Sequence, residues 1–280
     1  MHFFETVSET TGFINKCKTG DKTIGFVPTM GALHPGHISL INRSKSENDI
    51  TGCSIFVNPI QFNNPNDLEK YPRTLEEDLR KLEDSGCDLI FYPSVKEMYP
   101  EPVNKVYDFG HLDKVLEGEF RPGHFNGVAV VVHKLFQIFN PDRAYFGMKD
   151  YQQLRIIQTM TAQLNLPIEI VPCPTYREIN GLAMSSRNVR LTEDELELAP
   201  VIFQTLNDIK NIVGIGKIKE AEDFAKQQLD RIDGFKVEYF KIVDSETLLT
   251  VSGWNMAKSL IACTAVFVGN VRLIDNLILF

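Results

Sequence analysis

Two histidines stand three residues apart on a glycine-bearing stretch near the start of the chain, and their setting predicts a phosphate-binding turn. The stretch reads Pro-Thr-Met-Gly-Ala-Leu-His-Pro-Gly-His over residues 28–37, so the histidines are His34 and His37. It lies between an apolar run at residues 23–27, typical of a buried strand, and residues 38–44, typical of the opening of a helix. A helix start presents unpaired N–H groups and about +0.5 of an elementary charge, which favours phosphate oxygens. We therefore predict that this turn holds the triphosphate of a nucleotide.

The small residues of the turn, Gly31, Ala32 and Gly36, would let a phosphate approach the backbone closely. The imidazoles could add donors aimed at the charge that develops on a transferring phosphoryl group. Two alternatives remain open, since histidines at this spacing could also bind a metal or cap a helix. A metal site usually has a further ligand nearby, as in His-Glu-x-x-His, and residues 28–37 contain no carboxylate.

The composition is that of an ordinary globular protein. The chain has 280 residues, of which 43% are hydrophobic and 24% charged, so we expect one large domain or two smaller ones. The formal net charge of −8 argues against sequence-independent binding of nucleic acid, which needs a basic face. An anionic substrate must therefore be held by local groups against an unfavourable overall field.

Cysteine usage and hydropathy predict a cytoplasmic protein. The five cysteines are scattered, odd in number and never in Cys-x-x-Cys spacing, so neither a disulfide framework nor a zinc ribbon fits. The first residues do not combine a basic start with a long apolar stretch, and no apolar run approaches the roughly 20 residues of a membrane span. We expect neither a secretory signal nor a transmembrane segment.

Strand and helix patterns alternate up to about residue 174, which predicts an open parallel sheet covered on both faces. Ligands of such sheets bind beyond the carboxyl ends of the strands. The expected strands are residues 23–27, 50–57, 88–92, 142–147 and 168–172, and the expected helices are residues 6–18, 37–47, 75–85, 127–139 and 151–164. We interpret residues 127–139 as a core helix without a chemical role.

The pattern changes after Pro174. Two helices are expected at residues 192–212 and 216–231, followed by strands at residues 236–243, 260–268 and 271–279, which suggests a small antiparallel sheet. The sequence therefore predicts an α/β domain over residues 1–174 and a smaller α+β domain over residues 175–280.

Three further stretches carry residues suited to binding. Asn58 and Gln61 follow an expected strand and could orient hydroxyls and carboxylates without adding charge. Lys149 lies between a strand end and a helix start, where it could meet a phosphate as a point charge, with Gln153 one turn later. Two serines beside an arginine, at residues 185–187, could form a phosphate clamp.

Each of these stretches also has a simpler interpretation. Asn58 could be turn chemistry before Pro59, Lys149 could pair with Asp150 in solvent, and residues 185–187 could form a capped turn. The chain contains neither a Gly-x-x-x-x-Gly-Lys-Ser/Thr motif nor a Gly-x-Gly-x-x-Gly motif. If a nucleotide binds, the histidine turn must bind its phosphates, as those motifs do in other proteins.

Taken together, these stretches resemble the pantothenate synthetase (pantoate–β-alanine ligase) family of the His-x-Gly-His nucleotidylyltransferase superfamily. The resemblance covers essentially the whole chain and rests on the histidine turn together with Phe-Val-Asn-Pro-Ile-Gln-Phe, Tyr-Pro-Arg-Thr, Arg-Pro-Gly-His-Phe, Ala-Tyr-Phe-Gly-Met-Lys-Asp, Gly-Leu-Ala-Met-Ser-Ser-Arg-Asn and Arg-Leu-Ile-Asp-Asn. It implies a Rossmann-like parallel sheet and a C-terminal domain that closes over the active site.

The resemblance implies a ligase with ATP as co-substrate and two half-reactions. The carboxylate of (R)-pantoate attacks the α-phosphorus of ATP and gives pantoyl adenylate and pyrophosphate. The amine of β-alanine then attacks this mixed anhydride and gives pantothenate and AMP. The first step requires mainly positioning and charge neutralisation.

The same resemblance implies roles for individual residues. His37, His34 and Lys149 would be catalytic, Asp150 would meet the ribose, and the backbone near Tyr176 would meet the adenine. The implied ATP-binding residues are Met30, Gly31, Ala32, Leu33, His34, Pro35, Gly36, His37, Gly147, Met148, Lys149, Asp150, Tyr176, Met184, Ser185, Ser186 and Arg187. The implied binding residues for pantoate and β-alanine are Gln61, Gln153, Asn58 and Tyr71.

Mg²⁺ is expected on the phosphate oxygens, with Asp78 and Glu77 as the nearest carboxylate candidates by position, although a charged helix face is the simpler interpretation of both. A homodimer is expected from the resemblance. Asn180 stands where the family usually has aspartate, and Tyr176 replaces a common aliphatic residue. Two rival functions are a nucleotidylyltransferase that stops after nucleotidyl transfer and a non-catalytic nucleotide sensor.

Overall fold

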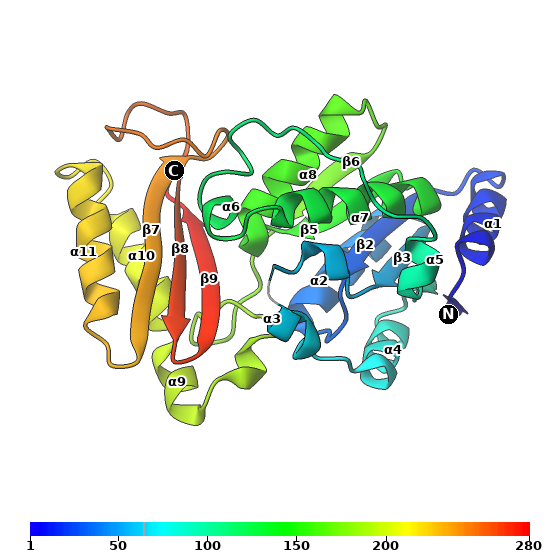
Figure 1. The fold of residues 1–280 in the computed structure, drawn as a ribbon, viewed down its shortest axis with the longest axis horizontal. Helices are drawn as coiled ribbons and strands as arrows, with labels where there is room; N and C mark the ends of the chain where they lie inside the picture. The colour runs from blue at the N-terminus through cyan, green and yellow to red at the C-terminus, as the bar shows by residue number, and fades with distance from the viewer. Residues whose placement is uncertain (64) are drawn as a thin grey trace. The chain divides into compact units, whose positions relative to one another are not determined.

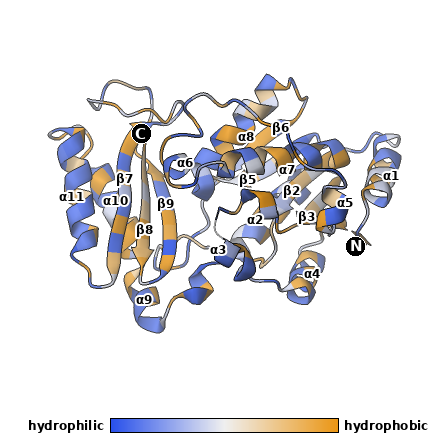
Figure 2. Cartoon of the chain, in the orientation of Figure 1, coloured by the Kyte–Doolittle hydropathy of each residue, from blue (hydrophilic) through white to orange (hydrophobic). Residues whose placement is uncertain are grey.

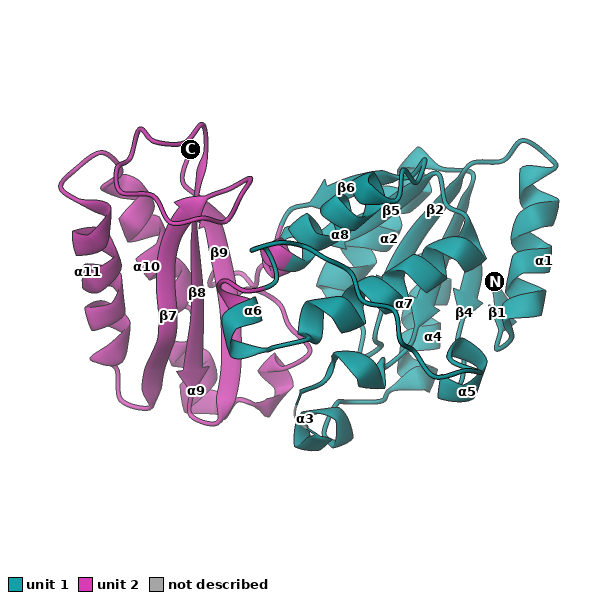
Figure 3. Ribbon diagram, turned by 45° about the horizontal axis from the view of Figure 1, so that its top comes forward, with its two compact units in different colours: residues 1–113, 118–148, 153–174 teal, residues 114–117, 149–152, 175–280 magenta. Residues whose placement is uncertain are grey.

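A computed structural model of the protein describes residues 1–63 and 65–280 (Figure 1). Within these residues the chain forms two compact units. Unit 1 comprises residues 1–113, 118–148 and 153–174, and unit 2 comprises residues 114–117, 149–152 and 175–280 (Figure 3). Two short segments thus group with unit 2 although unit 1 sequence flanks them. The expectation that residues 175–280 close over an active site stays a prediction.

Unit 1 is built on a parallel sheet. Over the described residues, six strands pair in the order β1-β4-β3-β2-β5-β6, and every pairing is parallel. The strands are β1 (His2–Phe4), β2 (Ile24–Thr29), β3 (Ile50–Ile55), β4 (Leu89–Phe91), β5 (Arg143–Gly147) and β6 (Glu169–Cys173). From β2 the following strands β3 and β4 are added on one side of the sheet, and β5 and β6 are added on the other side. The strand order therefore reverses between β2 and β5, and β1 forms the edge beside β4. Ligands of open α/β sheets bind at such a switch point.

Helices pack on both faces of this sheet because parallel strands need crossover connections of one hand. Helix α2 contacts α4 on one face, and α1 contacts α7 on the other. The helices before residue 175 are α1 (Val7–Lys18), α2 (Pro35–Glu47), α3 (Pro65–Glu69), α4 (Leu75–Asp84), α5 (Val95–Met98), α6 (Glu117–Phe120), α7 (His124–Phe139) and α8 (Tyr151–Gln163), with 3₁₀ turns at Pro59–Gln61 and Met148–Asp150.

Aromatic packing against glycine fixes the centre of unit 1. Phe26 of β2 stacks on Phe139 of α7 with ring centroids 4.1 Å apart, and both side chains are fully buried. A β-carbon on Gly52 of β3 would come within 2.5 Å of the Phe139 ring, so only glycine fits at this position of the strand.

Unit 2 contains a small antiparallel sheet. Its strands are β7 (Phe235–Asp244), β8 (Leu260–Val268) and β9 (Val271–Ile278), paired in the order β7-β8-β9. The helices of this part are α9 (Glu193–Leu198), α10 (Val201–Asn211) and α11 (Ile218–Asp230), with a 3₁₀ turn at Asn188–Arg190. Figure 2 shows hydrophilic residues along α11 and hydrophobic residues in the strands, and the buried side of α10 and α11 forms one core with the sheet.

The predicted fold class, a parallel α/β sheet followed by a smaller antiparallel α+β part, is confirmed. The helix expected at residues 192–212 is interrupted between Leu198 and Val201, where Pro200 lacks the N–H that a continuous helix needs. The edge strand β1 was not expected from its sequence. In the described part of the chain, no helix has the length and apolar character required to cross a membrane.

The burial of the cysteines gives a first test of this fold. Cys17 is half-buried, whereas Cys53, Cys87, Cys173 and Cys263 are buried. Burial raises the pKa of Cys87 to about 12 and that of Cys173 to about 11, so little thiolate is present at pH 8.

We expect iodoacetamide to modify Cys17 first in the native protein, as followed by peptide mass spectrometry. Equally fast modification of Cys173 would contradict the fold, and full modification in denaturant is the control.

Candidate active site

The predicted phosphate turn follows β2 and has a tight backbone. Gly31 and Ala32 both adopt the left-handed region, with φ of 82° and 50°. This conformation costs a non-glycine residue roughly 1–2 kcal/mol. A β-carbon on Gly31 would lie 3.1 Å from an Asp78 oxygen and from Ile55, so the turn is crowded on its inner side. The structure must therefore supply interactions that hold Ala32 in this shape.

His34 and His37 cap helix α2. His34 is the N-cap residue, and its Nδ1 accepts a hydrogen bond from the N–H of Gly36 at 3.2 Å. The N–H of His34 in turn donates to Nδ1 of His37 at 3.3 Å. The two ring centroids are 4.0 Å apart. The helix-capping alternative is therefore correct as local structure, and the capping contacts fix the orientation of the two rings.

Because each Nδ1 accepts a backbone N–H, the neutral rings carry their proton on Nε2. Each Nε2–H is then a donor on the ring edge opposite the cap. The first turn of α2 contains no acidic residue, so no carboxylate of the helix itself competes with an anion there. Among the residues described, no group of three or more histidine, cysteine, aspartate or glutamate side chains could hold a metal ion. The turn is suited to an anion.

Two side chains of helix α4 form hydrogen bonds with the backbone of the turn. The Asp78 carboxylate accepts the N–H of Ala32 at 2.9 Å and the N–H of Leu33 at 2.7 Å. Lys81, one turn later, donates to the carbonyl of Leu33 at 2.6 Å. Asp78 is 1% exposed, so both contacts are shielded from water.

This arrangement does not fit the metal site that the position of Asp78 and Glu77 in the sequence suggested. Both Asp78 oxygens accept backbone N–H groups and Oδ1 also accepts the Thr74 hydroxyl, so the carboxylate is engaged in holding the turn. Glu77 is exposed and forms an ion pair with Lys81 at 2.8 Å, which lowers the pKa of Glu77. Neither carboxylate is arranged as a ligand.

The amides after β3 form a buried network with the phosphate turn. Asn58 Nδ2 donates to Gln61 Oε1 at 3.0 Å, and Gln61 Nε2 lies 3.0 Å from the sulfur of Met30. The hydroxyl of Tyr99 donates to Asn58 Oδ1 at 2.9 Å, and burial raises the pKa of this tyrosine, which keeps it a donor. Asn58 is 1% exposed and Gln61 7%. The two amides are therefore held in one orientation.

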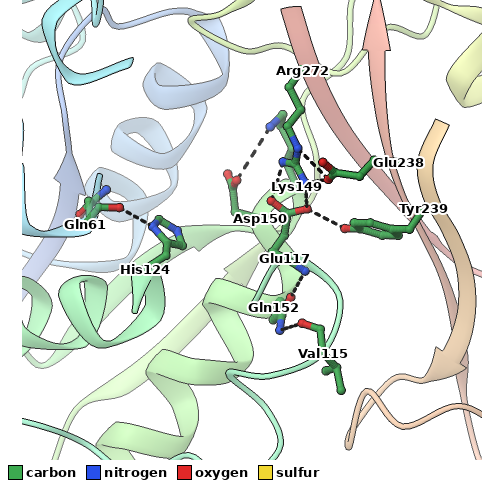
Figure 4. Close-up of polar contacts among 10 residues, drawn as sticks. All are labelled: Gln61, Val115, Glu117, His124, Lys149, Asp150, Gln152, Glu238, Tyr239 and Arg272. Carbon is green, nitrogen blue, oxygen red and sulfur yellow. Dashed lines mark hydrogen bonds and ion pairs between the residues drawn. The ribbon is translucent and has the colours of Figure 1, made fainter. Parts of the chain in front are cut away.

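Helix α7 supports these amides, although its sequence suggested only a core helix. His124 Nδ1 lies 2.8 Å from the carbonyl oxygen of Gln61 (Figure 4). Asn58 Nδ2 also donates to the carbonyl of Gly127 at 3.1 Å. A β-carbon on Gly127 would come within 2.5 Å of the Ile60 carbonyl oxygen. Glycine is required there so that the turn of residues 59–61 can lie directly on the helix.

Other predicted residues of unit 1 lie at strand or helix ends. Gly147 ends β5, and a β-carbon there would meet nothing within 4 Å, so space remains beside the backbone. Met148 begins the following 3₁₀ turn. Tyr71 is buried and packs edge-on against Phe62 at 5.8 Å. Gln153 is half-buried in the first turn of α8.

The segment of residues 149–152 is held within unit 2. Asn276 Nδ2 of β9 donates to the carbonyl of Lys149 at 2.8 Å. The hydroxyl of Tyr151 donates to the carbonyl of Ser245 at 3.0 Å. The Lys149 side chain is 16% exposed, and its Nζ lies 3.9 Å from Asp150 Oδ1, so the predicted Lys-Asp pair is a loose one.

Glu117 links this segment to the antiparallel sheet (Figure 4). Its N–H donates to Gln152 Oε1 at 3.0 Å, and its carboxylate receives two hydrogen bonds from Arg272, at 2.7 and 2.8 Å. Tyr239 also donates to this carboxylate at 2.8 Å. Burial alone would lower the pKa of Arg272, but the bonds and charges of Glu117 and Glu238 outweigh it and raise the pKa. The arginine is therefore permanently charged.

The loop that carries the predicted serine–arginine clamp is anchored on the same strand. Arg177 forms a bidentate pair with Asp275, at 2.6 and 2.8 Å, and its guanidinium stacks on the ring of Phe203 at 3.7 Å. The N–H of Arg187 donates to Ser185 Oγ at 3.2 Å. Ser185, Ser186, Arg187 and Met184 are all half-buried.

The two departures from the family pattern leave this loop intact. Asn180 Oδ1 accepts the N–H of Leu182 at 3.1 Å, an acceptor role that an aspartate would fill equally well. Tyr176 uses its backbone carbonyl to accept the N–H of Met184 at 2.9 Å, while its side chain is 45% exposed.

Several of these supporting residues were missed from the sequence. Arg177, His124, Tyr99 and Glu117 had been given no role. The late Arg-Leu-Ile-Asp-Asn run carried a signal for Arg177, the partner of Asp275. Two adjacent polar residues in a strand with apolar neighbours are expected to have buried hydrogen-bond partners. Asp275 and Asn276 are 5% and 7% exposed.

Comparison with known proteins identifies the family. The family model described as pantoate-beta-alanine ligase matches residues 2–278. The chain belongs to the pantoate-beta-alanine ligase family. It is 48% identical to pantothenate synthetase of Bacteroides fragilis strain YCH46 over 277 residues, which is 99% of this chain and 98% of the relative.

Solved structures of the family have the same fold. A crystal structure of pantothenate synthetase from Thermus thermophilus aligns with a TM-score of 0.93 at 42% identity and covers 100% of both chains. A structure of pantoate-beta-alanine ligase from Francisella tularensis, complexed with beta-gamma ATP and beta-alanine, aligns with a TM-score of 0.83 at 36% identity and covers 100% of this chain and 98% of that one.

The contact between α7 and the buried amides can be tested with one methyl group. Gly127→Ala should overpack the helix against Ile60 and lower the free energy of unfolding by about 1–3 kcal/mol. Gly12→Ala is the matched control, because Gly12 lies in α1 with nothing within 4 Å of its added β-carbon. The control should be neutral or stabilising by up to about 1 kcal/mol. Urea unfolding measures both, and equal effects would contradict the described contact.

Proposed function

We propose that the chain condenses (R)-pantoate with β-alanine to form pantothenate, with ATP converted to AMP and pyrophosphate. Membership of the pantoate-beta-alanine ligase family and the Francisella tularensis relative complexed with beta-gamma ATP and beta-alanine support this proposal. The single observation that carries it here is the pair of imidazoles at the N-terminus of α2, whose Nδ1 atoms accept backbone N–H groups and are thereby held in one orientation.

In the first half-reaction, a carboxylate oxygen of pantoate attacks the α-phosphorus of ATP. The bond from this phosphorus to the oxygen that bridges to the β-phosphate breaks, and pyrophosphate leaves. Negative charge grows on the leaving oxygens, so donors that are already oriented lower the barrier. We assign this role to His34 and His37, with the N–H groups at the start of α2 and the small residues from Met30 to Gly36 lining the phosphates.

In the second half-reaction, the neutral amine of β-alanine attacks the acyl carbon of pantoyl adenylate. The bond from the acyl carbon to the AMP oxygen breaks, and the amine loses a proton. A free carboxylate could not react in this way because its leaving group would be oxide, whereas AMP is a good leaving group. Gln61 and Asn58 are assigned to pantoate, and Gln61 also to β-alanine, because oriented amides bind hydroxyls and carboxylates without adding charge. Gln153 and Tyr71 complete this proposed set.

Residues of unit 2 receive their roles from the family resemblance. Lys149 neutralises phosphate charge, Asp150 binds the ribose and the backbone at Tyr176 meets the adenine. The remaining proposed ATP contacts are Met184, Ser185, Ser186 and Arg187 of unit 2, and Gly147 and Met148 of unit 1. The anchoring of Lys149 by Asn276 and of the serine-bearing loop by Asp275 supports these assignments, since both segments are held on one strand.

Mg²⁺ is proposed as an ion that arrives with ATP, since it prefers phosphate oxygens and keeps several waters. The donor sets of Asp78 and Glu77 do not fit a protein site for it. The chain is further proposed to act in the cytoplasm, on the ground of its cysteine usage and hydropathy, and to form a homodimer, on the ground of the resemblance alone.

The reaction is tested by following AMP. Purified protein with ATP and Mg²⁺ should form AMP steadily only when pantoate and β-alanine are both present. Continuous AMP formation with either one omitted would refute the ligase assignment. Pyrophosphate release that stops after nucleotidyl transfer would instead indicate an adenylyltransferase, and binding of ATP without turnover would indicate a sensor.

Two substitutions test the charge-neutralising groups. His37→Ala and Lys149→Ala should each lower kcat by at least about 100-fold, the usual cost of one oriented donor to the transition state. Lys226→Ala, an exposed lysine of α11, should leave kcat within about twofold, since it lies outside the proposed site. Circular dichroism checks that each variant is folded. Near-normal turnover of either site variant would reject the role assigned to that residue.

A further inference from the structure

We infer that Asp78 is a positioning residue of the phosphate turn. It holds the backbone at Ala32 and Leu33 so that His34 and His37 are oriented to bind the phosphates of ATP. This inference deepens the proposed function and rests on it for the identity of the ligand. It replaces the interpretation of Asp78 as a metal ligand, which came from its position in the sequence.

The contacts of Asp78 are directed at the strained part of the turn. Its Oδ2 accepts the N–H of Ala32 at 2.9 Å and its Oδ1 accepts the N–H of Leu33 at 2.7 Å. Ala32 is the non-glycine residue of the turn with φ of 50°. These two peptide groups immediately precede His34, the N-cap of α2. The carboxylate therefore stabilises the backbone at the point where the chain leaves β2 and enters the helix.

The carboxylate is itself fixed by its own helix. Asp78 lies in the first turn of α4, where its N–H donates to the carbonyl of Thr74 at 2.9 Å, and the Thr74 hydroxyl donates to Oδ1 at 3.2 Å. With 1% of its surface exposed, the side chain is enclosed by protein. Hydrogen bonds to an ionised acceptor are stronger in such surroundings than in water.

Lys81 adds a second anchor from the same helix. Its Nζ donates to the carbonyl of Leu33 at 2.6 Å, so both polar groups of Leu33 are bound by α4. Glu77 pairs with this lysine at 2.8 Å and keeps it on the turn. A carboxylate beside a phosphate site would normally repel the ligand. Here two backbone N–H groups and the Thr74 hydroxyl donate to the carboxylate and offset part of its charge, so Asp78 can organise the turn.

The chemistry explains why this residue is an acid and not an amide. Two N–H groups reach two different oxygens of Asp78, and a carboxylate offers acceptors on both. Asparagine has one oxygen and one NH₂ group, so Asp78→Asn would bring a donor against one of the backbone donors. The hydrogen bond from the N–H of Ala32 or of Leu33 would then be lost, and the backbone that orients the two imidazoles would change its conformation.

The first experiment uses the ligand-free protein and does not depend on the activity. The ring resonances of His34 and His37 are recorded by NMR in protein carrying ¹³C-labelled histidine, for the wild type, Asp78→Asn and Glu83→Gln. Glu83 is an exposed carboxylate of the same helix and serves as the control. The Asp78→Asn substitution should shift both ring resonances, and Glu83→Gln should shift neither. Unchanged resonances in a folded Asp78→Asn variant would overturn the inference.

The second experiment separates positioning from metal binding. Asp78→Asn should raise the KM for ATP by about 10- to 100-fold, the worth of a hydrogen bond to a charged group. It should leave the KM for β-alanine unchanged. Raising Mg²⁺ should not restore it, whereas recovery at high Mg²⁺, shared by Glu77→Gln, would show metal ligands and refute the inference.

Two outcomes need separate treatment. If Asp78→Asn does not fold, Lys81→Met removes the second anchor and should give a smaller shift of the same two resonances, so the inference stays testable. If the wild type forms no AMP from ATP, pantoate and β-alanine, the proposed function fails, while the resonances still report whether Asp78 positions the turn.

Discussion

The backbone N–H groups between β2 and α2 must find acceptors, and this requirement organises unit 1. Two of them bind Asp78, one binds the ring of His37 and one binds the ring of His34. Each pairing satisfies a donor that burial would otherwise penalise. Each also orients a side chain or a peptide plane that faces the helix start. Local stability and the proposed phosphate recognition thus use the same hydrogen bonds.

Parallel strands bring the next groups to the same edge of the sheet. Residues after β2 and β3 leave neighbouring strands in one direction, so Met30 and Gln61 come into contact. The close approach of α7, which Gly127 permits, helps to hold these amides, and His124 contacts the carbonyl of Gln61. A helix that packs the core therefore also sets the position of polar groups at its first turn.

The sequence predicted the fold class and most elements because hydrophobic periodicity and capping residues act locally. It failed where a distant partner decides. The short edge strand β1 forms by pairing with β4, which lies far along the chain. The break of the expected helix at Pro200 is different, because a local signal was present and the apolar periodicity on both sides of it masked it. For the site, spacing pointed to His34 and His37, but no local signal joins Asp78 to Ala32 across 46 positions, or Asn276 to Lys149 across 127. Such pairings follow from tertiary structure alone.

Strand β9 has a consequence for how the protein matures on the ribosome. Its Asp275 and Asn276 complete the contacts of Arg177 and Lys149, and β9 can join the sheet only beside β8. A nascent chain that has already folded its parallel sheet therefore still lacks the last polar supports of its lysine and its serine-bearing loop. Lys149 and the serine-bearing loop therefore gain these contacts only after β9, which follows both of them in the sequence, has been synthesised.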